Sequence, residues 1–294
     1  MPPLFSNMAA LATILNPLAP HKEQLWTFSN NGDGDLVLMR GENLLKPAAV
    51  AFHQVSRQQT SFIRNPSSIV ALYYQSMINV YAYSGENTLM RLSPMLEQVG
   101  APNTVMDGVG SLAGIVSPSG ESAWLYYVSA GIGPSFTLSE LAIDSTDPSV
   151  HVSGLILRDT YLAAAYYKYQ GLDERRLFFQ ANDFLRMVKM NTQEDGPLKD
   201  TGNARNNPPT PLAACTAPNQ NDILITYLYY VDRDDTLYRA TLGQFLSSVA
   251  PVENAPKMAS WSQIAVTAGA THNYVSYATK SGDNLPVTIW ADLR

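Results

Sequence analysis

Charged and aromatic residues stand at similar positions along this sequence, each a few residues before or within a short apolar segment. They are Arg64, Asp107, Arg158, Tyr161, Arg205 and Trp261. Arginine, tyrosine and tryptophan donate hydrogen bonds, and such donors stabilise an oxygen on which negative charge develops without a metal or a nucleophile. In a second interpretation, Arg64 and Arg158 form ion pairs with Asp107 or Asp159 that tie neighbouring parts of the fold together. The sequence leaves both interpretations open.

Other chemistry has weaker support. The four histidines are His21, His53, His151 and His272. None lies at helical or strand spacing from another, so we expect no histidine metal site. His53 and His272 have the pKa range of proton carriers. The acidic turns 31–35 and 232–235 have alternating carboxylates like a calcium loop, but hairpin turns favour the same residues for backbone reasons. Nucleophile elbows and phosphate loops are missing, and we expect no cofactor.

Six β-hairpins position these side chains. The clearest runs from Leu228 to Leu242, with an aromatic strand, a polar turn and a second strand. The other five pairs of strands are 25–28 with 36–40, 79–83 with 88–92, 124–127 with 137–141, 176–179 with 184–187, and 274–277 with 287–290. A hairpin that recurs along the whole chain indicates a repeat architecture.

A short strand of small apolar residues precedes every hairpin. These strands are 8–10, 69–71, 112–114, 162–164, 212–214 and 264–266. Their intervals of about 43 to 61 residues fit one propeller blade, and small residues suit the crowded innermost strand. Segments 50–53, 150–152 and 245–248 would supply outer fourth strands. We predict an all-β fold, a six-bladed β-propeller of four-stranded antiparallel blades, with residues 1–294 as one domain and the N-terminal segment pairing with the last blade. A β-sandwich is the alternative.

Composition sets further limits. Of 294 residues, 46% are apolar and 15% charged, which suits a large core and argues against disorder. The net charge of -6 and the lack of a Lys/Arg run exclude a nucleic-acid partner. Cys215 is the single cysteine, so a disulfide framework is excluded and we expect a packed thiol. No apolar segment reaches the roughly 20 residues of a membrane span. Residues 1–19 do not form an intact signal peptide, and the compartment stays open, including the secretory pathway if an upstream leader was removed.

The hairpins resemble the blades of fungal six-bladed propeller lectins that bind fucose. Those blades read approximately Ile-Arg-Val-Tyr-Tyr-Gln, a turn, then Ile-x-Glu-Leu, and the resemblance covers the whole chain as a repeat pattern. It implies sugar sites made from an Arg on the second strand, a Glu on the third and an aromatic residue of a neighbouring blade. Such a pair donates to and accepts from sugar hydroxyls while the ring covers an apolar sugar face.

The sequence departs from this pattern in every blade. Arg176 stands at the Arg position, with Arg186 assigned to the Glu position; Glu140 stands at the Glu position, with Trp124 at the Arg position. Elsewhere the Glu position is assigned to arginines, namely Arg40, Arg91 and Arg239. We therefore do not expect multivalent fucose binding of the family's kind.

In fold type, size and loss of the sugar triad, the chain also resembles fungal propeller hetero-Diels-Alderases of tropolone sesquiterpenoid pathways. That resemblance implies a cofactor-free enzyme of the pericyclase type, which holds an apolar alkene against an enone-like heterodiene in one orientation. On this hypothesis the catalytic residues are Arg158, Arg205, Trp261 and Tyr161, and the substrate-binding residues are Arg64, Asp107, Trp124 and His272. The alternatives are a carbohydrate-binding lectin of fucose type with altered specificity, and a propeller that binds proteins. A homo-oligomer is left open.

One connection is longer than the rest. Asn191 to Pro211 is rich in Pro, Gly and Asn, and loops of this length are often functional. We expect either a solvated insertion or a lid.

Overall fold

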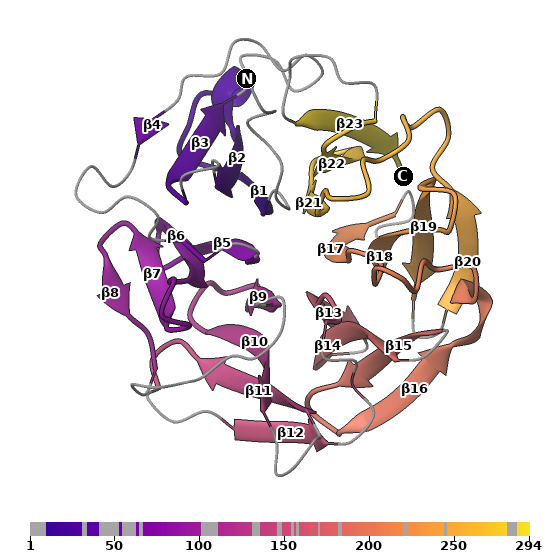
Figure 1. Ribbon diagram of the computed structural model, residues 1–294, viewed down its shortest axis with the longest axis horizontal. Coiled ribbons are helices and arrows are strands. Elements are labelled where there is room, and N and C mark those ends of the chain that lie inside the picture. Colours follow the sequence, from indigo (N-terminus) through magenta and orange to yellow (C-terminus); the bar gives the residue numbers. More distant parts are fainter. Residues whose placement is uncertain are drawn as a thin grey trace.

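The computed structural model describes most of the chain. The described residues are 10–30, 34–40, 53–54, 63–64, 67–100, 111–130, 136–145, 149–153, 156, 159–169, 171–181, 184–219, 223–243, 246–280 and 287–294. They form six antiparallel sheets arranged as a ring, with the first strand of each sheet nearest the axis (Figure 1). The predicted six-bladed β-propeller is confirmed, and the sandwich alternative is wrong.

Each of the first five blades has four strands in the described residues. Blades 1 and 2 consist of β1 (Leu11–Leu15), β2 (Leu25–Asn30), β3 (Leu36–Arg40) and β4 (His53–Gln54), then β5 (Ile69–Tyr74), β6 (Met77–Tyr83), β7 (Leu89–Ser93) and β8 (Glu97–Gln98). Blade 3 consists of β9 (Leu112–Val116), β10 (Ala123–Ala130), β11 (Phe136–Ala142) and β12 (Ser149–Ser153).

Blade 4 consists of β13 (Ala163–Tyr169), β14 (Leu172–Ala181), β15 (Phe184–Lys189) and β16 (Glu194–Leu198). Blade 5 consists of β17 (Ala213–Pro218), β18 (Leu224–Val231), β19 (Leu237–Leu242) and β20 (Leu246–Pro251). Blade 6 has three strands among the described residues, β21 (Ala265–Ala268), β22 (His272–Tyr277) and β23 (Thr288–Leu293). Two short 3-10 helices are η1 (His21–Glu23) and η2 (Lys199–Thr201).

The core lies between blades, because both faces of the second and third strands are covered. On β18, Leu228 and Tyr230 pack towards blade 4, whereas the alternate residues Tyr227 and Tyr229 pack towards blade 6. The period of two along a strand sends successive side chains to opposite faces. Strands buried on both faces are apolar almost throughout, which explains the aromatic runs in the sequence.

In four blades, a serine or threonine before the inner strand accepts a hydrogen bond from the backbone at the end of the second strand. Backbone N–H groups of Tyr83, Gln180, Val231 and Ala278 donate to the side-chain oxygens of Ser67, Thr160, Thr210 and Ser262, at 3.4, 2.7, 2.8 and 2.8 Å. Each of these hydroxyl residues is buried. In blade 1 the roles are reversed, because the Ala10 N–H donates to Asn30 Oδ1 at 2.9 Å. These bonds satisfy buried backbone groups that would otherwise be costly.

The first and last blades close the ring through side chains. Thr13 Oγ1 on β1 donates to Ser276 Oγ on β22 at 2.8 Å, and Leu11 packs with Ala265 and Val287. β1 itself pairs with β2 inside its own blade. The predicted pairing of the N-terminal segment with the last blade is not seen among the described residues, which begin at residue 10.

The segment from Asn191 to Pro211 is neither a solvated insertion nor a lid. It contains β16, the outer strand of blade 4, and then η2. Gly196 and Pro197 are typical of loops, which is why the sequence did not predict a strand here. An edge strand tolerates proline because one of its sides forms no hydrogen bonds to a neighbouring strand. The rest of the segment is anchored, since Gln180 accepts a hydrogen bond from Thr210 N and donates to Arg205 O.

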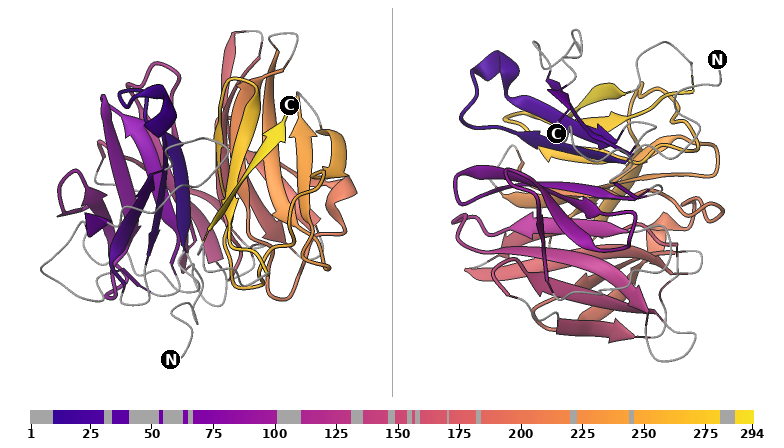
Figure 2. Two further views of the ribbon diagram at one scale, coloured as in Figure 1. Left: turned by 90° about the horizontal axis from the view of Figure 1, so that it is seen from above. Right: turned by 60° about the vertical axis from the view of Figure 1, so that its left-hand side comes forward.

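The strands run roughly along the ring axis, so the turns gather on two opposite faces (Figure 2). One face holds the connections that lead into the inner strands and the turns between second and third strands. The other face holds the turns between first and second strands. No helix in the described part of the chain is long and apolar enough to cross a membrane.

Candidate functional site

Four side chains from two neighbouring blades meet between blades 3 and 4. Trp124 lies on β10 and Glu140 on β11, and Glu140 pairs across the sheet with Tyr126. Since Trp124 and Tyr126 are two residues apart, these side chains share the face of blade 3 that is turned towards blade 4. Tyr166 on β13 and Arg175 on β14 are direct cross-strand partners on the opposing face.

An ion pair joins the two blades at this interface. Arg175 Nη1 donates to Glu140 Oε2 at 2.6 Å. The guanidinium carbon of Arg175 lies 4.6 Å from the centroid of the Trp124 ring, within cation–π range. Trp124 in turn stacks on Tyr166, with ring centroids 6.4 Å apart and an interplanar angle of 29°. A cation, an anion and two aromatic faces therefore meet in one place.

Asn191 fixes the orientation of Arg175. Its Oδ1 accepts hydrogen bonds from the backbone N and from Nε of Arg175, both at 3.2 Å, while its Nδ2 donates to Asp173 O at 3.0 Å. Together with the bond to Glu140, these contacts leave Nη2 of Arg175 without a hydrogen bond to a described residue. The guanidinium of Arg175 is thus held in one orientation.

The site is partly buried. The side chain of Glu140 is 9% exposed and that of Arg175 is 17% exposed. Tyr126 lies beneath the pair, and its hydroxyl has no hydrogen-bond partner in the described part of the chain. Burial, followed by the neighbouring Glu140 carboxylate, raises the pKa of Tyr126 well above its usual value, so the group stays a neutral hydroxyl.

Chemically, this arrangement suits a polyhydroxylated ligand. A carboxylate accepts from hydroxyl groups, a guanidinium donates to them, and charge-assisted bonds of both kinds are stronger than neutral ones. The rings of Trp124 and Tyr166 offer an apolar surface beside these polar groups. The pair that the sequence comparison found broken within each blade is re-formed here between two blades.

The strand register also corrects two assignments from the sequence. In blade 4, the residue that pairs with Phe178 is Met187, in the manner of Glu140 and Tyr126 in blade 3. Met187 therefore occupies the Glu position, and Arg186 lies on the opposite face. In blade 1 the matching residue is Leu38, and Arg40 was assigned two residues too far along.

Arg176 fills the family's Arg position but is enclosed. Its side chain is 1% exposed, its Nε donates to Glu174 at 2.6 Å, and its guanidinium carbon lies 3.6 Å from the ring centroid of Tyr167. Its Nη1 lies 3.4 Å from Thr226 Oγ1 in blade 5. Because Tyr167 and Glu174 cover it, Arg176 is a packed group of the interface between blades 4 and 5.

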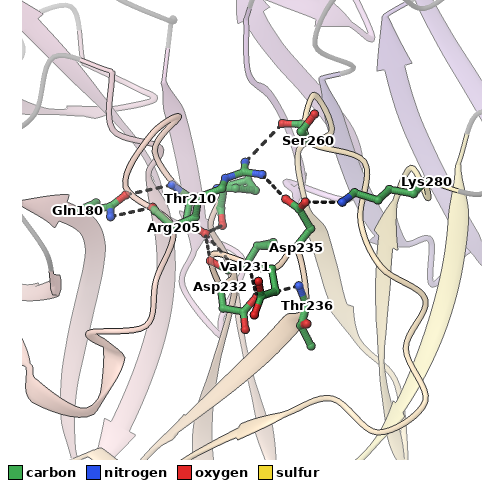
Figure 3. A network of polar contacts seen from close by, with 11 residues as sticks. Gln180, Arg205, Thr210, Val231, Asp232, Asp235, Thr236, Ser260 and Lys280 are labelled. Atoms are coloured by element: carbon green, nitrogen blue, oxygen red, sulfur yellow. Dashed lines mark hydrogen bonds and ion pairs between the residues drawn. The ribbon is translucent and has the colours of Figure 1, made fainter.

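The predicted catalytic residue Arg205 belongs to a separate network of polar contacts, near the β18–β19 turn (Figure 3). It lies between blades 4 and 5, and its Nη1 donates to Asp235 Oδ1 at 2.8 Å in the β18–β19 turn. Asp235 also accepts from Lys280 Nζ at 2.6 Å, and Arg205 Nη2 lies 3.4 Å from Ser260 O. These contacts tie blades 4, 5 and 6 together.

The other predicted residues are spread over both faces. Tyr161 is buried in the core between blades 4 and 5, where burial raises its pKa to about 12. Trp261 and Arg64 are half-buried near the entrances to β21 and β5. His272 begins β22 on the opposite face, where Nδ1 lies 2.8 Å from Thr271 Oγ1. Of the six predicted residues that the structure describes, Trp124 alone lies in the cluster between blades 3 and 4.

Arg158 and Asp107 lie outside the described residues, as do the side chains of His53 and His151. The central channel is described. It is about 110 Å³ in volume and is lined by the inner strands, largely by Ala, Val, Leu and Ile side chains. Pockets for small molecules usually exceed about 300 Å³. The described channel is smaller than such pockets.

Comparisons with known proteins agree with this architecture. No family model matches the sequence, and no curated protein matches it. Among solved structures, AofleA from Arthrobotrys oligospora is similar with a TM-score of 0.69 and 13% identity, over 98% of this chain and 87% of that one. The chain is a fucose-lectin-like propeller in its fold. A mutant of the Aleuria aurantia lectin in complex with Fucalpha1-6GlcNAc gives a TM-score of 0.65 and 17% identity over 97% and 96%. SapL1 lectin in complex with alpha methyl fucoside gives 0.68 and 15% over 98% and 97%.

The cycloaddition hypothesis is contradicted by these matches, because structures that are similar over nearly the whole chain are lectins. The sequence alternative, a carbohydrate-binding lectin, agrees better with them. The roles given to Arg158, Arg205, Trp261 and Tyr161 rested on the cycloaddition and are not retained. What sequence reasoning missed is Arg175, because it looked for both members of the pair within one blade. The signal was present, since Arg175 and Arg176 are adjacent and must face different blades.

Proposed function

We propose that this protein binds carbohydrate, and that its site lies between blades 3 and 4. The observation that carries the proposal is the 2.6 Å pair between Arg175 and Glu140, half-buried against Trp124. The ligand class that we propose is a terminal fucose-type sugar, since solved lectins of the same fold are complexes with fucosides.

Each residue has a separate role in this proposal. Glu140 accepts hydrogen bonds from sugar hydroxyls, and Arg175 donates to a hydroxyl or ring oxygen through Nη2. Trp124 and Tyr166 contact the apolar face of the sugar ring. Asn191 acts as a positioning residue that holds Arg175. Binding then replaces water around groups that are already ordered, so little rotamer entropy is lost.

Two other arginines on the second and third strands lie in different surroundings. Arg91 in blade 2 pairs with Glu97 of its own blade at 2.6 Å, and the Glu97 side chain is 47% exposed. Arg176, between blades 4 and 5, is enclosed by Tyr167. We therefore expect one fucoside site per chain.

The experiment is titration calorimetry of the whole chain with alpha methyl fucoside. Wild type is expected to bind, and Glu140→Gln, Arg175→Met and Trp124→Ala are each expected to lose at least about tenfold in affinity, which corresponds to about 1.4 kcal/mol. Glu97→Gln is the matched control, because it removes a carboxylate from an Arg–Glu pair of the same length outside the cluster. The proposal is refuted if wild type does not bind, or if the control loses as much as Glu140→Gln.

A further inference from the structure

A second ion pair occupies the matching place between blades 5 and 6, with its charges reversed. Arg239 on β19 pairs across the sheet with Tyr229, as Glu140 pairs with Tyr126 in blade 3. Arg239 Nη1 donates to Asp292 Oδ2 on β23 at 2.7 Å. The cation thus comes from the earlier blade and the anion from the later one, opposite to the interface between blades 3 and 4.

The surroundings of this pair also repeat the first interface. The guanidinium carbon of Arg239 lies 5.8 Å from the ring centroid of Tyr227, the residue at the position of Trp124. Tyr229 donates to Asp292 Oδ2 at 2.6 Å and accepts from Asn273 Nδ2 at 2.8 Å. The pair is therefore held firmly, with an aromatic ring beside it.

The charge balance differs from that of the first interface. Arg294 follows β23, and its guanidinium donates to the carbonyls of Pro218 and Gly269 at 3.2 and 2.6 Å. Burial raises the pKa of Tyr227, while Arg294 and Arg239 oppose that rise, which places both cations within electrostatic range of this ring. A second guanidinium, that of Arg294, therefore lies within electrostatic range of the ring beside Arg239.

Donors remain available at the second interface. Two hydrogen bonds of Arg239, to Asp292 Oδ2 and to Leu293 O, run through Nη1 alone, and the side chain is 26% exposed. Asn273 is fully buried, yet its Oδ1 has no partner among the described residues. Nε of Arg294 likewise has none in the part of the chain that the structure describes. A buried polar group without a partner calls for water or a ligand group.

We propose that the interface between blades 5 and 6 binds a sugar carrying a carboxylate, such as a uronic acid residue. At the strand position where the first interface has the Glu140 carboxylate, this one has the Arg239 guanidinium, which favours a ligand with negatively charged acceptors. The planar guanidinium of Arg239, which is partly exposed, can donate two parallel hydrogen bonds to a carboxylate. The inference rests on the proposed function in taking blade interfaces as glycan sites, but it concerns other residues and another ligand class.

The experiment compares methyl glucuronide with methyl glucoside in titrations of the whole chain. Wild type is expected to bind the glucuronide at least about tenfold more tightly than the glucoside, and the difference should shrink as salt is added. Arg239→Met is expected to abolish the preference. Arg239→Lys keeps the charge but not the fork and should retain part of it.

The controls separate this proposal from the first. Glu140→Gln should leave glucuronide binding unchanged, and Arg239→Met should leave fucoside binding unchanged. Thermal melting identifies a variant that fails to fold, in which case Arg239→Lys decides the question. The inference is overturned if wild type shows no preference for the glucuronide, if Arg239→Met and Arg239→Lys both keep the full preference, or if Glu140→Gln removes it.

Discussion

The ion pair between Arg175 and Glu140 should couple blades 3 and 4 more strongly than a surface pair does. Its atoms are 2.6 Å apart, and the Glu140 side chain is 9% exposed. The pair of Arg91 and Glu97 has the same residue types and the same 2.6 Å distance, but Glu97 is 47% exposed. The two pairs therefore differ chiefly in burial of the carboxylate and in whether they join two blades.

The magnitude follows from these exposures. Two unit charges about 4 Å apart interact by about 4 kcal/mol at an effective dielectric constant near 20, and desolvation of both groups offsets part of this energy. A charged hydrogen bond retains about 1.5 to 3 kcal/mol net. We expect a coupling energy of about 2 kcal/mol for Arg175 with Glu140, and of about 0.5 kcal/mol for the solvated control pair.

A double-mutant cycle in urea measures this coupling. The variants are Arg175→Met, Glu140→Gln and their combination, with Arg91→Met, Glu97→Gln and their combination as the control cycle. Unfolding is followed by tryptophan fluorescence and by circular dichroism, whose transitions must coincide for the free energies of unfolding to be comparable. Equal coupling in the two cycles would refute the reasoning, as would a zero value for the first.

Three further predictions concern the scaffold. Thr210→Val leaves the buried N–H of Val231 without an acceptor and should lower the free energy of unfolding, measured in urea, by about 1 to 3 kcal/mol. The control Thr192→Val changes an exposed residue and should alter that free energy by less than about 0.5 kcal/mol. Equal effects of the two variants would contradict the role of the hydrogen bond. Burial raises the pKa of Asp235, but hydrogen bonds from neighbouring cations outweigh it and hold that pKa below its ordinary value. The stability that ionised Asp235 contributes is therefore complete above its pKa in the unfolded chain, about 3.9, and is lost as pH falls through its lower pKa in the folded protein. Asp235→Asn should therefore reduce the loss of folding stability at acidic pH. An unchanged dependence on acidic pH would contradict this prediction. Burial raises the pKa of Cys215 to about 12, so alkylation at pH 8 should be slow until urea unfolds the chain, and equally fast labelling of the folded protein would contradict the assignment.

The fold could be predicted because its local signals are repeated and consistent. Small residues mark each inner strand, and aromatic residues mark each second strand. β16 was missed because Gly196 and Pro197 carry a loop signal, and only the sheet around them shows that an edge strand tolerates both residues. Local composition cannot reveal such an edge, since tertiary context decides it.

The candidate site was predicted in part. Trp124 and Glu140 were recognised from the blade pattern, but Arg175 was not, because its partner lies 35 residues earlier in a different sheet. Sequence comparison within one blade compares residues on the same hairpin, whereas the chemistry lies between hairpins. Predicting the pair needed the face of each strand, which depends on register and changes with a shift of one residue.

The hydroxyl residues that precede the inner strands bear on whether the order of the blades along the chain matters for the fold. In four blades, the hydroxyl residue before the inner strand accepts a hydrogen bond from the end of the second strand of the same blade; these residues are Ser67, Thr160, Thr210 and Ser262. Each of these hydrogen bonds therefore lies within one blade. The described contacts between the first and last blades are made by side chains, of which Thr13 and Ser276 form one. A circularly permuted chain that starts at a different blade keeps all of these bonds, and among the described residues none of them depends on which blade is synthesised first.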